Sequence, residues 1–136
     1  MKDFITKGAE VYWLDPAHET SGIYEVVNVE LPIEDDSVIL LCSGEPGKEN
    51  YSEVETTPNE VFRPLHKIAE DIRSNWKKIY FGAVPYLEAM ETLNGMDDKF
   101  ICDDADEIVM YFLANAQTWR GEVARRVKKE LNAMLK

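Results

Sequence analysis

Apolar and polar residues alternate in short runs over the first 65 positions of the chain. Residues 27–31 read Val-Asn-Val-Glu-Leu, a period of two that is typical of a strand with one buried face. Residues 38–42 are continuously apolar, which is typical of a central strand covered on both faces. With the turn residues between them, these runs predict five strands, at about 8–14, 23–31, 37–42, 51–56 and 61–65.

Five short strands in succession favour a small antiparallel barrel that is closed or nearly closed. An open sheet leaves backbone N–H and C=O groups unpaired along its two edge strands, whereas closure pairs them. Turns are expected at Asp15-Pro16, where a polar connection follows, at residues 32–36, which combine Pro32 with three acidic residues, and at residues 57–60.

From position 66 onward the period changes, and apolar residues recur every three or four positions as in amphipathic helices. Pro85 suits the first turn of a helix, and Asp104 with Glu107 three residues later has the sequence of a capping box. Thr118 is expected to cap the last helix. Four helices are predicted, at about 66–80, 84–93, 104–116 and 118–135.

The fold class predicted from the two periods is α+β with two parts. Residues 1–65 are expected to form the five-stranded antiparallel barrel, and residues 66–136 a bundle of about four helices packed against it. No long linker separates the two parts, and the sequence contains no internal repeat.

Two resemblances accompany these patterns. Five short strands with a long first connection and a turn before the last strand resemble the SH3-like barrel of Src-homology, Tudor and KOW domains. Residues 80–90, 111–116 and 118–122 resemble a helical module of small uncharacterised bacterial proteins that often occur in mobile-element contexts. The first resemblance implies a peptide-binding groove, and the second implies no known activity.

Composition favours a folded protein that remains in the cytoplasm. The chain has 136 residues, of which 45% are hydrophobic and 30% charged, close to globular averages. No apolar run approaches the roughly 18 residues of a membrane helix, and the N-terminus lacks the apolar core of a secretory signal. Cys42 and Cys102 are therefore expected to be reduced thiols.

The net charge of −11 is unevenly distributed, and this constrains the partners. Net charges of −10, −5 and +4 fall on residues 1–65, 66–119 and 120–136. A strongly acidic body repels phosphate backbones, so direct contact with nucleic acid is expected only from the last helix.

No motif predicts catalysis, a metal site or a cofactor. The possible ligands His18, His66, Cys42 and Cys102 lack the short spacing of zinc sites, and the acidic run at 103–107 lacks the pattern of an EF-hand loop. Neither cysteine has basic neighbours that would stabilise a thiolate, and no glycine-rich phosphate loop or Gly-x-Ser-x-Gly sequence is present. We expect the acidic run to cap a helix.

Aromatic residues of the first part suggest a binding groove. In an SH3-like barrel, rings near strand ends and acidic residues in the first loop line a groove for proline-rich or methylated ligands. The alternative is that the rings fill the barrel core. The candidate residues are Tyr12, Trp13, Tyr24, Tyr51, Asp15 and Glu19, with Phe62 as a further aromatic neighbour.

The last helix has basic residues off its apolar stripe. Such a face is solvated, docks on the acidic part of the chain, or binds nucleic acid or an acidic partner. The candidate residues are Arg120, Arg125, Arg126, Lys128 and Lys129.

These observations predict a non-enzymatic protein-interaction or regulatory module with a protein partner. One alternative is a nucleic-acid-associated protein, acting through the basic helix or as an acidic DNA mimic that occupies a DNA-processing protein. A second alternative is an enzyme of unknown type, which a pocket with converging polar groups would support.

Overall fold

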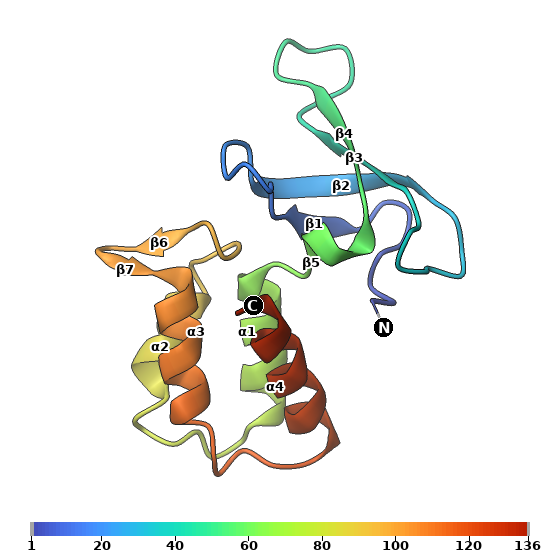
Figure 1. Ribbon diagram of the computed structural model, residues 1–136. Coiled ribbons are helices and arrows are strands. Elements are labelled where there is room, and N and C mark those ends of the chain that lie inside the picture. The colour runs from blue at the N-terminus through green and yellow to red at the C-terminus, as the bar shows by residue number, and fades with distance from the viewer. Residues whose placement is uncertain (1, 136) are drawn as a thin grey trace. The chain divides into compact units, whose positions relative to one another are not determined.

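A computed structural model describes residues 2–135 of the chain. The chain divides into two compact units, Met1–Pro64 and Leu65–Lys136, called the N-terminal and C-terminal units below. The class is α+β, as predicted: a five-stranded antiparallel sheet is followed by four helices (Figure 1).

The five-stranded antiparallel sheet of the N-terminal unit is confirmed, but it is open, so the prediction that it is closed or nearly closed into a barrel is wrong. Its order is β4-β3-β2-β1-β5, and β4 and β5 are its two edges. The short 3-10 helix η1, Pro58–Glu60, connects β4 to β5 along the chain. Pro58 has no backbone N–H and so cannot donate a hydrogen bond to a neighbouring strand. With only two residues, β5 pairs with β1 alone. The strands are β1 Glu10–Trp13, β2 Gly22–Val29, β3 Ile39–Ser43, β4 Ser52–Thr56 and β5 Val61–Phe62.

A register shift in β2 changes which residues face the core. The pattern predicted Val27, Val29 and Leu31 on the buried face. Val29 packs against the core as predicted, but Val26 pairs with Leu41, and the register then shifts before the next pair. Val26 is fully buried, Val27 is only half-buried, and Leu31 is 69% exposed beyond the end of the strand. The extra residue in one strand resets the alternation of faces, and a period of two cannot reveal it.

Strand β3 is also less covered than its apolar sequence predicted. It lies between β2 and β4, and only alternate residues, Ile39 and Leu41, are fully buried. Leu40 and Cys42 lie on the other face and are half-exposed, while Val38, before the strand, is 59% exposed. One face of the sheet therefore carries the core, and the other face is partly open at β3.

The core of the N-terminal unit lies on one face of the sheet. The chain before β1 contributes Ile5 to it, and Lys2 fastens this segment by donating from Nζ to the carbonyl oxygens of Pro58 (2.7 Å) and Val61 (2.8 Å). The buried cluster comprises Ile5, Val11, Trp13, Tyr24, Val26, Ile39, Leu41 and Val61.

The C-terminal unit is an up-and-down arrangement of four helices in which each packs on two others (Figure 1). Its apolar stripes meet in a core that includes Ile68, Leu87, Phe112 and Leu131, all fully buried. A two-stranded hairpin, which the sequence did not reveal, joins α2 to α3. The elements are α1 Leu65–Asn75, α2 Val84–Met90, β6 Lys99–Phe100, β7 Asp103–Asp104, α3 Ala105–Ala114 and α4 Glu122–Met134.

Two predicted helix caps differ from the structure. Asp104 precedes α3 as predicted, but its side chain makes no capping hydrogen bond and lies 3.5 Å from Lys99 Nζ instead. Gly121, not Thr118, precedes α4, with φ of +113°, a conformation that favours glycine. Within residues 2–135, none of the helices is both long and apolar enough to cross a membrane.

Candidate functional site

Three of the rings predicted to form a groove are packing residues. Trp13 and Tyr24 belong to the core cluster and meet edge to face at 5.5 Å between ring centroids. Trp13 Nε1 donates to Thr56 Oγ1 and Glu60 Oε1, both at 3.2 Å. Tyr12 lies on the opposite face of β1, paired across the strands with Phe62, and is also buried. All three rings are buried, Trp13 and Tyr24 in the core cluster and Tyr12 on the other face of β1, so they do not line an open groove.

Tyr51 lies apart from those rings, just before β4, and is half-buried. Its hydroxyl donates to Glu53 Oε2 at 2.6 Å. The bond to this carboxylate raises the pKa of Tyr51 to about 12, because the phenol proton is held there. Tyr51 and Glu53 form a local pair and not part of a groove with Trp13.

Asp15 is engaged within its own loop and is not available to a ligand. Its carboxylate accepts bonds from the backbone N–H groups of Ala17 (2.9 Å), Thr20 (2.9 Å) and Glu19 (3.1 Å), and from the Thr20 hydroxyl (2.9 Å). These donors lower the pKa of Asp15 to about 2. Asp15 shapes the loop between β1 and β2, while the Glu19 side chain is exposed on it.

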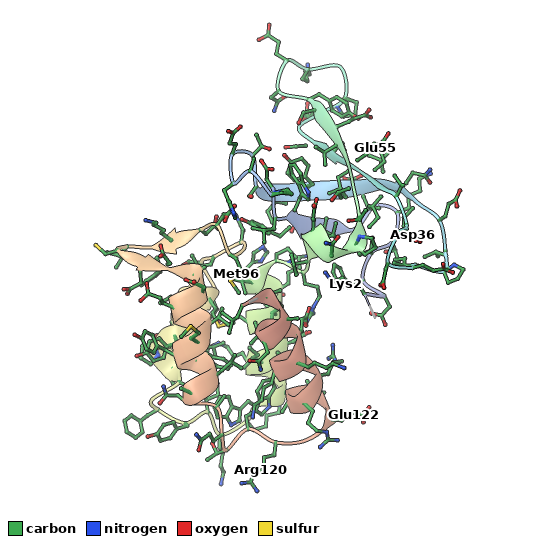
Figure 2. All side chains as sticks on the ribbon, viewed as in Figure 1. Lys2, Asp36, Glu55, Met96, Arg120 and Glu122 are labelled. Atoms are coloured by element: carbon green, nitrogen blue, oxygen red, sulfur yellow. The ribbon has the colours of Figure 1, made fainter. Side chains whose placement is uncertain are left out.

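The basic face of the last helix is smaller than its sequence suggested. Arg125, Arg126 and Lys129 are exposed, but Lys128 turns back and donates from Nζ to the Trp119 carbonyl oxygen at 2.6 Å. Burial, with the nearby charge of Arg120 as the lesser cause, lowers the pKa of Lys128. Arg120 itself is exposed on the loop before α4 (Figure 2).

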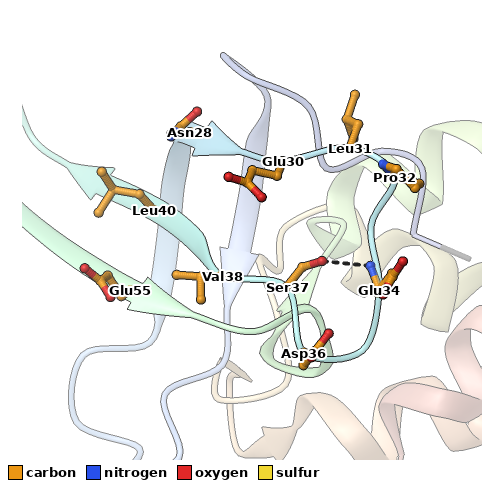
Figure 3. Close-up of a pocket in the computed structure, with 10 residues that line it drawn as sticks. All are labelled: Asn28, Glu30, Leu31, Pro32, Glu34, Asp36, Ser37, Val38, Leu40 and Glu55. Atoms are coloured by element: carbon orange, nitrogen blue, oxygen red, sulfur yellow. Dashed lines mark hydrogen bonds between the residues drawn. The ribbon is translucent and has the colours of Figure 1, made fainter.

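The outer face of the sheet carries a hollow of about 650 Å³ in the N-terminal unit (Figure 3). We call it the acidic hollow. Its wall is formed by the ends of β2, β3 and β4 and by the connection between β2 and β3. It is lined by Asn28, Glu30, Leu31, Pro32, Glu34, Asp36, Ser37, Val38, Leu40 and Glu55.

Strand register places one side of the acidic hollow. Leu40 pairs with Asn28 on β2 and with Glu55 on β4, so these three side chains stand in a row across the outer face. The register shift in β2 turns Asn28 to this face.

The β2–β3 connection closes the other side of the acidic hollow. Glu34 and Ser37 fasten it, because the Glu34 N–H donates to Ser37 Oγ at 2.8 Å and the Ser37 N–H donates to the Glu34 carbonyl oxygen at 3.0 Å. This turn holds Asp36 at the rim beside the exposed Val38.

The acidic hollow combines a strong negative charge with apolar surface. Four carboxylates line it, from Glu30, Glu34, Asp36 and Glu55, and no basic residue does. Leu31 and Val38, 69% and 59% exposed, supply apolar contact area between these charges. Such a surface suits a cationic group on an alkyl stem, since the ammonium or guanidinium meets the carboxylates while the stem packs on Leu and Val.

Sequence reasoning missed this site because its residues looked like a turn. The sequence predicts a turn at residues 32–36 and places Val38 in a buried strand. The available signal was the position of Leu31 and Val38 on either side of three consecutive acidic residues. Only the sheet register adds Asn28, Leu40 and Glu55 to them.

A second group of carboxylates lies at the start of α3. Asp104, Asp106 and Glu107 have oxygen atoms within 4.8 Å of one another, and they are the one such group found within residues 2–135. All three are exposed, and Asp106 Oδ1 accepts a bond from the Glu107 N–H at 2.8 Å. Carboxylates are stabilised at a helix N-terminus by the macrodipole, which accounts for the group without an ion.

The remaining candidate ligands are dispersed. Cys42 is half-buried on the sheet and Cys102 exposed at the β6–β7 hairpin, and both are free thiols. His18 is exposed in the β1–β2 loop and His66 is half-buried at the start of α1.

Comparison of the chain with protein-family models, curated proteins and solved structures gives no match. The resemblances to SH3-like domains and to the helical module therefore remain expectations. The acidic hollow is interpreted from its own geometry.

Proposed function

We propose that this protein is a non-enzymatic interaction module whose N-terminal unit binds a cationic segment of a protein partner in the acidic hollow. The observation that carries the proposal is the lining itself: four carboxylates and two exposed aliphatic side chains share one concave surface with no basic residue. A Lys- or Arg-containing segment with an aliphatic residue complements both features.

Electrostatics supports this proposal at longer range. The N-terminal unit has a net charge of −10, from 4 Lys/Arg and 14 Asp/Glu. A concave surface of one sign concentrates the potential and speeds the encounter with an oppositely charged partner. Each exposed ion pair contributes about 0.5 kcal/mol, so the affinity is moderate and falls with salt.

We retain the resemblance of the N-terminal unit to SH3-like domains as part of this proposal. The order of the strands, with η1 between β4 and β5, is compatible with that resemblance even though the sheet is open. The binding surface proposed here is the acidic hollow on the outer face of β2, β3 and β4, in place of the aromatic groove.

The proposal is tested with variants that neutralise the acidic hollow. Glu30→Gln, Asp36→Asn and Glu55→Gln are combined, and binding of a labelled peptide with leucines between lysines is measured by fluorescence anisotropy. We expect the Kd to rise roughly tenfold, because three exposed ion pairs are lost at about 0.5 kcal/mol each.

The matched control neutralises three exposed carboxylates of the same unit outside the hollow, in Glu19→Gln, Glu45→Gln and Glu49→Gln. The net charge of the two proteins is then equal. The control should change the Kd less than threefold. Equal losses in both proteins would show that the acidic hollow is not the binding site.

The second candidate function is an acidic DNA mimic that occupies a cationic DNA-processing protein. It is favoured by further carboxylates on the same outer face, where Glu25 and Glu53 flank Cys42 across the strands. A mimic presents its charge over a wide surface, so equal losses in the two triple variants would support it. Competition of duplex DNA with this protein for a DNA-binding domain is the direct measurement.

A further inference from the structure

One end of the C-terminal unit carries exposed aromatic and basic residues, with Glu122, in the first turn of α4, as an exposed carboxylate at the same end (Figure 2). Residues 74–87 and 108–121 contain no Asp or Glu, although the whole chain has 26. They include the α1–α2 and α3–α4 connections, which lie at the same end of the four helices, opposite the β6–β7 hairpin (Figure 1). We call this region the loop end.

Specific contacts hold the two connections of the loop end together. The rings of Trp76 and Trp119 stack with centroids 5.7 Å apart and planes 14° from parallel. Trp119 Nε1 donates to Asn75 Oδ1 at 2.9 Å, and the Lys128 bond to the Trp119 carbonyl oxygen fixes the second connection to α4. Both tryptophans are buried, so they support the surface without forming it.

Aromatic side chains are exposed on this support. Phe81 is 78% exposed and Tyr80 43%, and their ring centroids lie 4.8 Å apart. Gly82 allows close approach here, since a Cβ would lie 2.6 Å from Tyr80 Cε2 and 2.8 Å from Asn115 Oδ1. Tyr111 on α3 is also exposed, and the centroid of its ring lies 5.5 Å from that of Tyr86.

Basic side chains are also exposed on the two connections that carry these rings and Trp119. Lys77 and Lys78 lie in the same connection as Tyr80, separated from it by Ile79, and are exposed. Lys77 Nζ also donates to the Ser74 carbonyl oxygen at 2.7 Å, which holds it at the end of α1. Arg120 extends from the second connection, away from the helices (Figure 2).

We propose that the loop end binds single-stranded nucleic acid, with Tyr80 and Phe81 stacking on bases and Lys77, Lys78 and Arg120 contacting phosphates. Single-stranded nucleic acid binds to exposed aromatic rings, because each unpaired base has a flat face that can stack on a ring. It also binds to nearby cations, because each nucleotide carries a negatively charged phosphate. A duplex hides its base faces, and the three cations are too few to overcome repulsion from the acidic remainder of the chain. This surface is independent of the acidic hollow.

The test is fluorescence anisotropy of the full chain with labelled oligo-dT and oligo-U of about 12 nucleotides at about 50 mM NaCl. Phe81→Ala should weaken binding roughly 5- to 100-fold through the loss of one stacked base. Combined Lys77→Gln, Lys78→Gln and Arg120→Gln should lower the slope of log K against log salt by about 2, because three phosphate contacts are lost.

Matched controls use residues outside the loop end. Ile101→Ala removes a side chain that is 84% exposed at the β6–β7 hairpin, and Lys48→Gln removes an exposed lysine of the N-terminal unit. Both should leave the affinity unchanged. Phe81 is highly exposed, so its variant should keep the native circular dichroism spectrum.

Three outcomes would overturn the proposal. The first is an absence of binding by the wild type at low salt, and the second is equal affinity for duplex and single strand. The third is displacement of the oligonucleotide by polyglutamate at equal charge with no effect of Phe81→Ala, which would assign the loop end to an acidic protein surface instead.

Discussion

Asp15 organises the connection between β1 and β2 with a single side chain. Its two carboxylate oxygens accept four hydrogen bonds from the residues that follow, and its own N–H donates to the Ser21 hydroxyl oxygen at 2.8 Å. This arrangement lets His18 adopt a left-handed conformation, with φ of +57°. We therefore expect the ordering of this loop to depend on the negative charge of Asp15.

The stability that Asp15 contributes should depend on pH. Its pKa of about 2 in the folded protein is below the ordinary value, so the contribution is present in full above pH of about 4 and is lost as the pH falls toward 2. Asp15→Asn should destabilise the protein at neutral pH, and the difference from wild type should shrink across that window. Urea unfolding of both proteins at several pH values measures it. A difference that does not vary with pH would contradict the role of the charge.

Helix α4 shows that two adjacent lysines have different roles. Lys128 and Lys129 follow each other in the sequence, and both were predicted on a basic face that is solvated, docks on the acidic part of the chain, or binds a partner. Lys129 is exposed, whereas Lys128 Nζ bonds to the Trp119 carbonyl oxygen and lies 6.0 Å from the centre of the Trp119 ring. A rotation of one position along a helix changes the direction of a side chain by about 100°, which separates the two.

Lys128→Gln should therefore destabilise the C-terminal unit by about 1 kcal/mol, through loss of a charged hydrogen bond to a carbonyl oxygen. Lys129→Gln is the matched control and should change the free energy of unfolding by less than about 0.5 kcal/mol. Chemical denaturation followed by tryptophan fluorescence compares them. Equal effects of the two substitutions would mean that the Lys128 bond contributes nothing.

At the scale of the whole molecule, the two units differ in net charge. The N-terminal unit has a net charge of −10, whereas the C-terminal unit carries −1 because its basic residues nearly balance its acidic ones. Repulsion among like charges destabilises a compact state, and salt screens it. The acidic hollow and the loop end belong to units of different net charge, and we expect the stabilities of these units to respond differently to ionic strength.

Raising NaCl from about 20 mM to about 300 mM should increase protection from hydrogen exchange more in the sheet than in the helices. The amide of Val26, bonded to the Ala9 carbonyl oxygen at 2.9 Å, reports on the N-terminal unit, and that of Phe112 reports on the C-terminal unit. Exchange followed by NMR gives both from one sample. A larger gain at Phe112 would show that charge repulsion does not govern the stability of the sheet.

The order and type of the main elements followed from the sequence alone. Five strands and four helices were predicted near their observed places, because periods of two and of about 3.6 reflect which side of each element is buried. The small β6–β7 hairpin escaped prediction because two-residue strands are too short to show a period. The charge asymmetry also required only the sequence.

Tertiary structure decided which side chains are available. Trp13 and Asp15 were plausible ligand-binding residues by type, but the core and the β1–β2 loop occupy them. The acidic hollow combines residues of three strands, with Asn28 turned to the same face by the register shift in β2, and the two connections of the loop end are held together by two distant tryptophans that stack. Local sequence determines the periodicity of each element, whereas exposure depends on contacts between residues far apart in the chain.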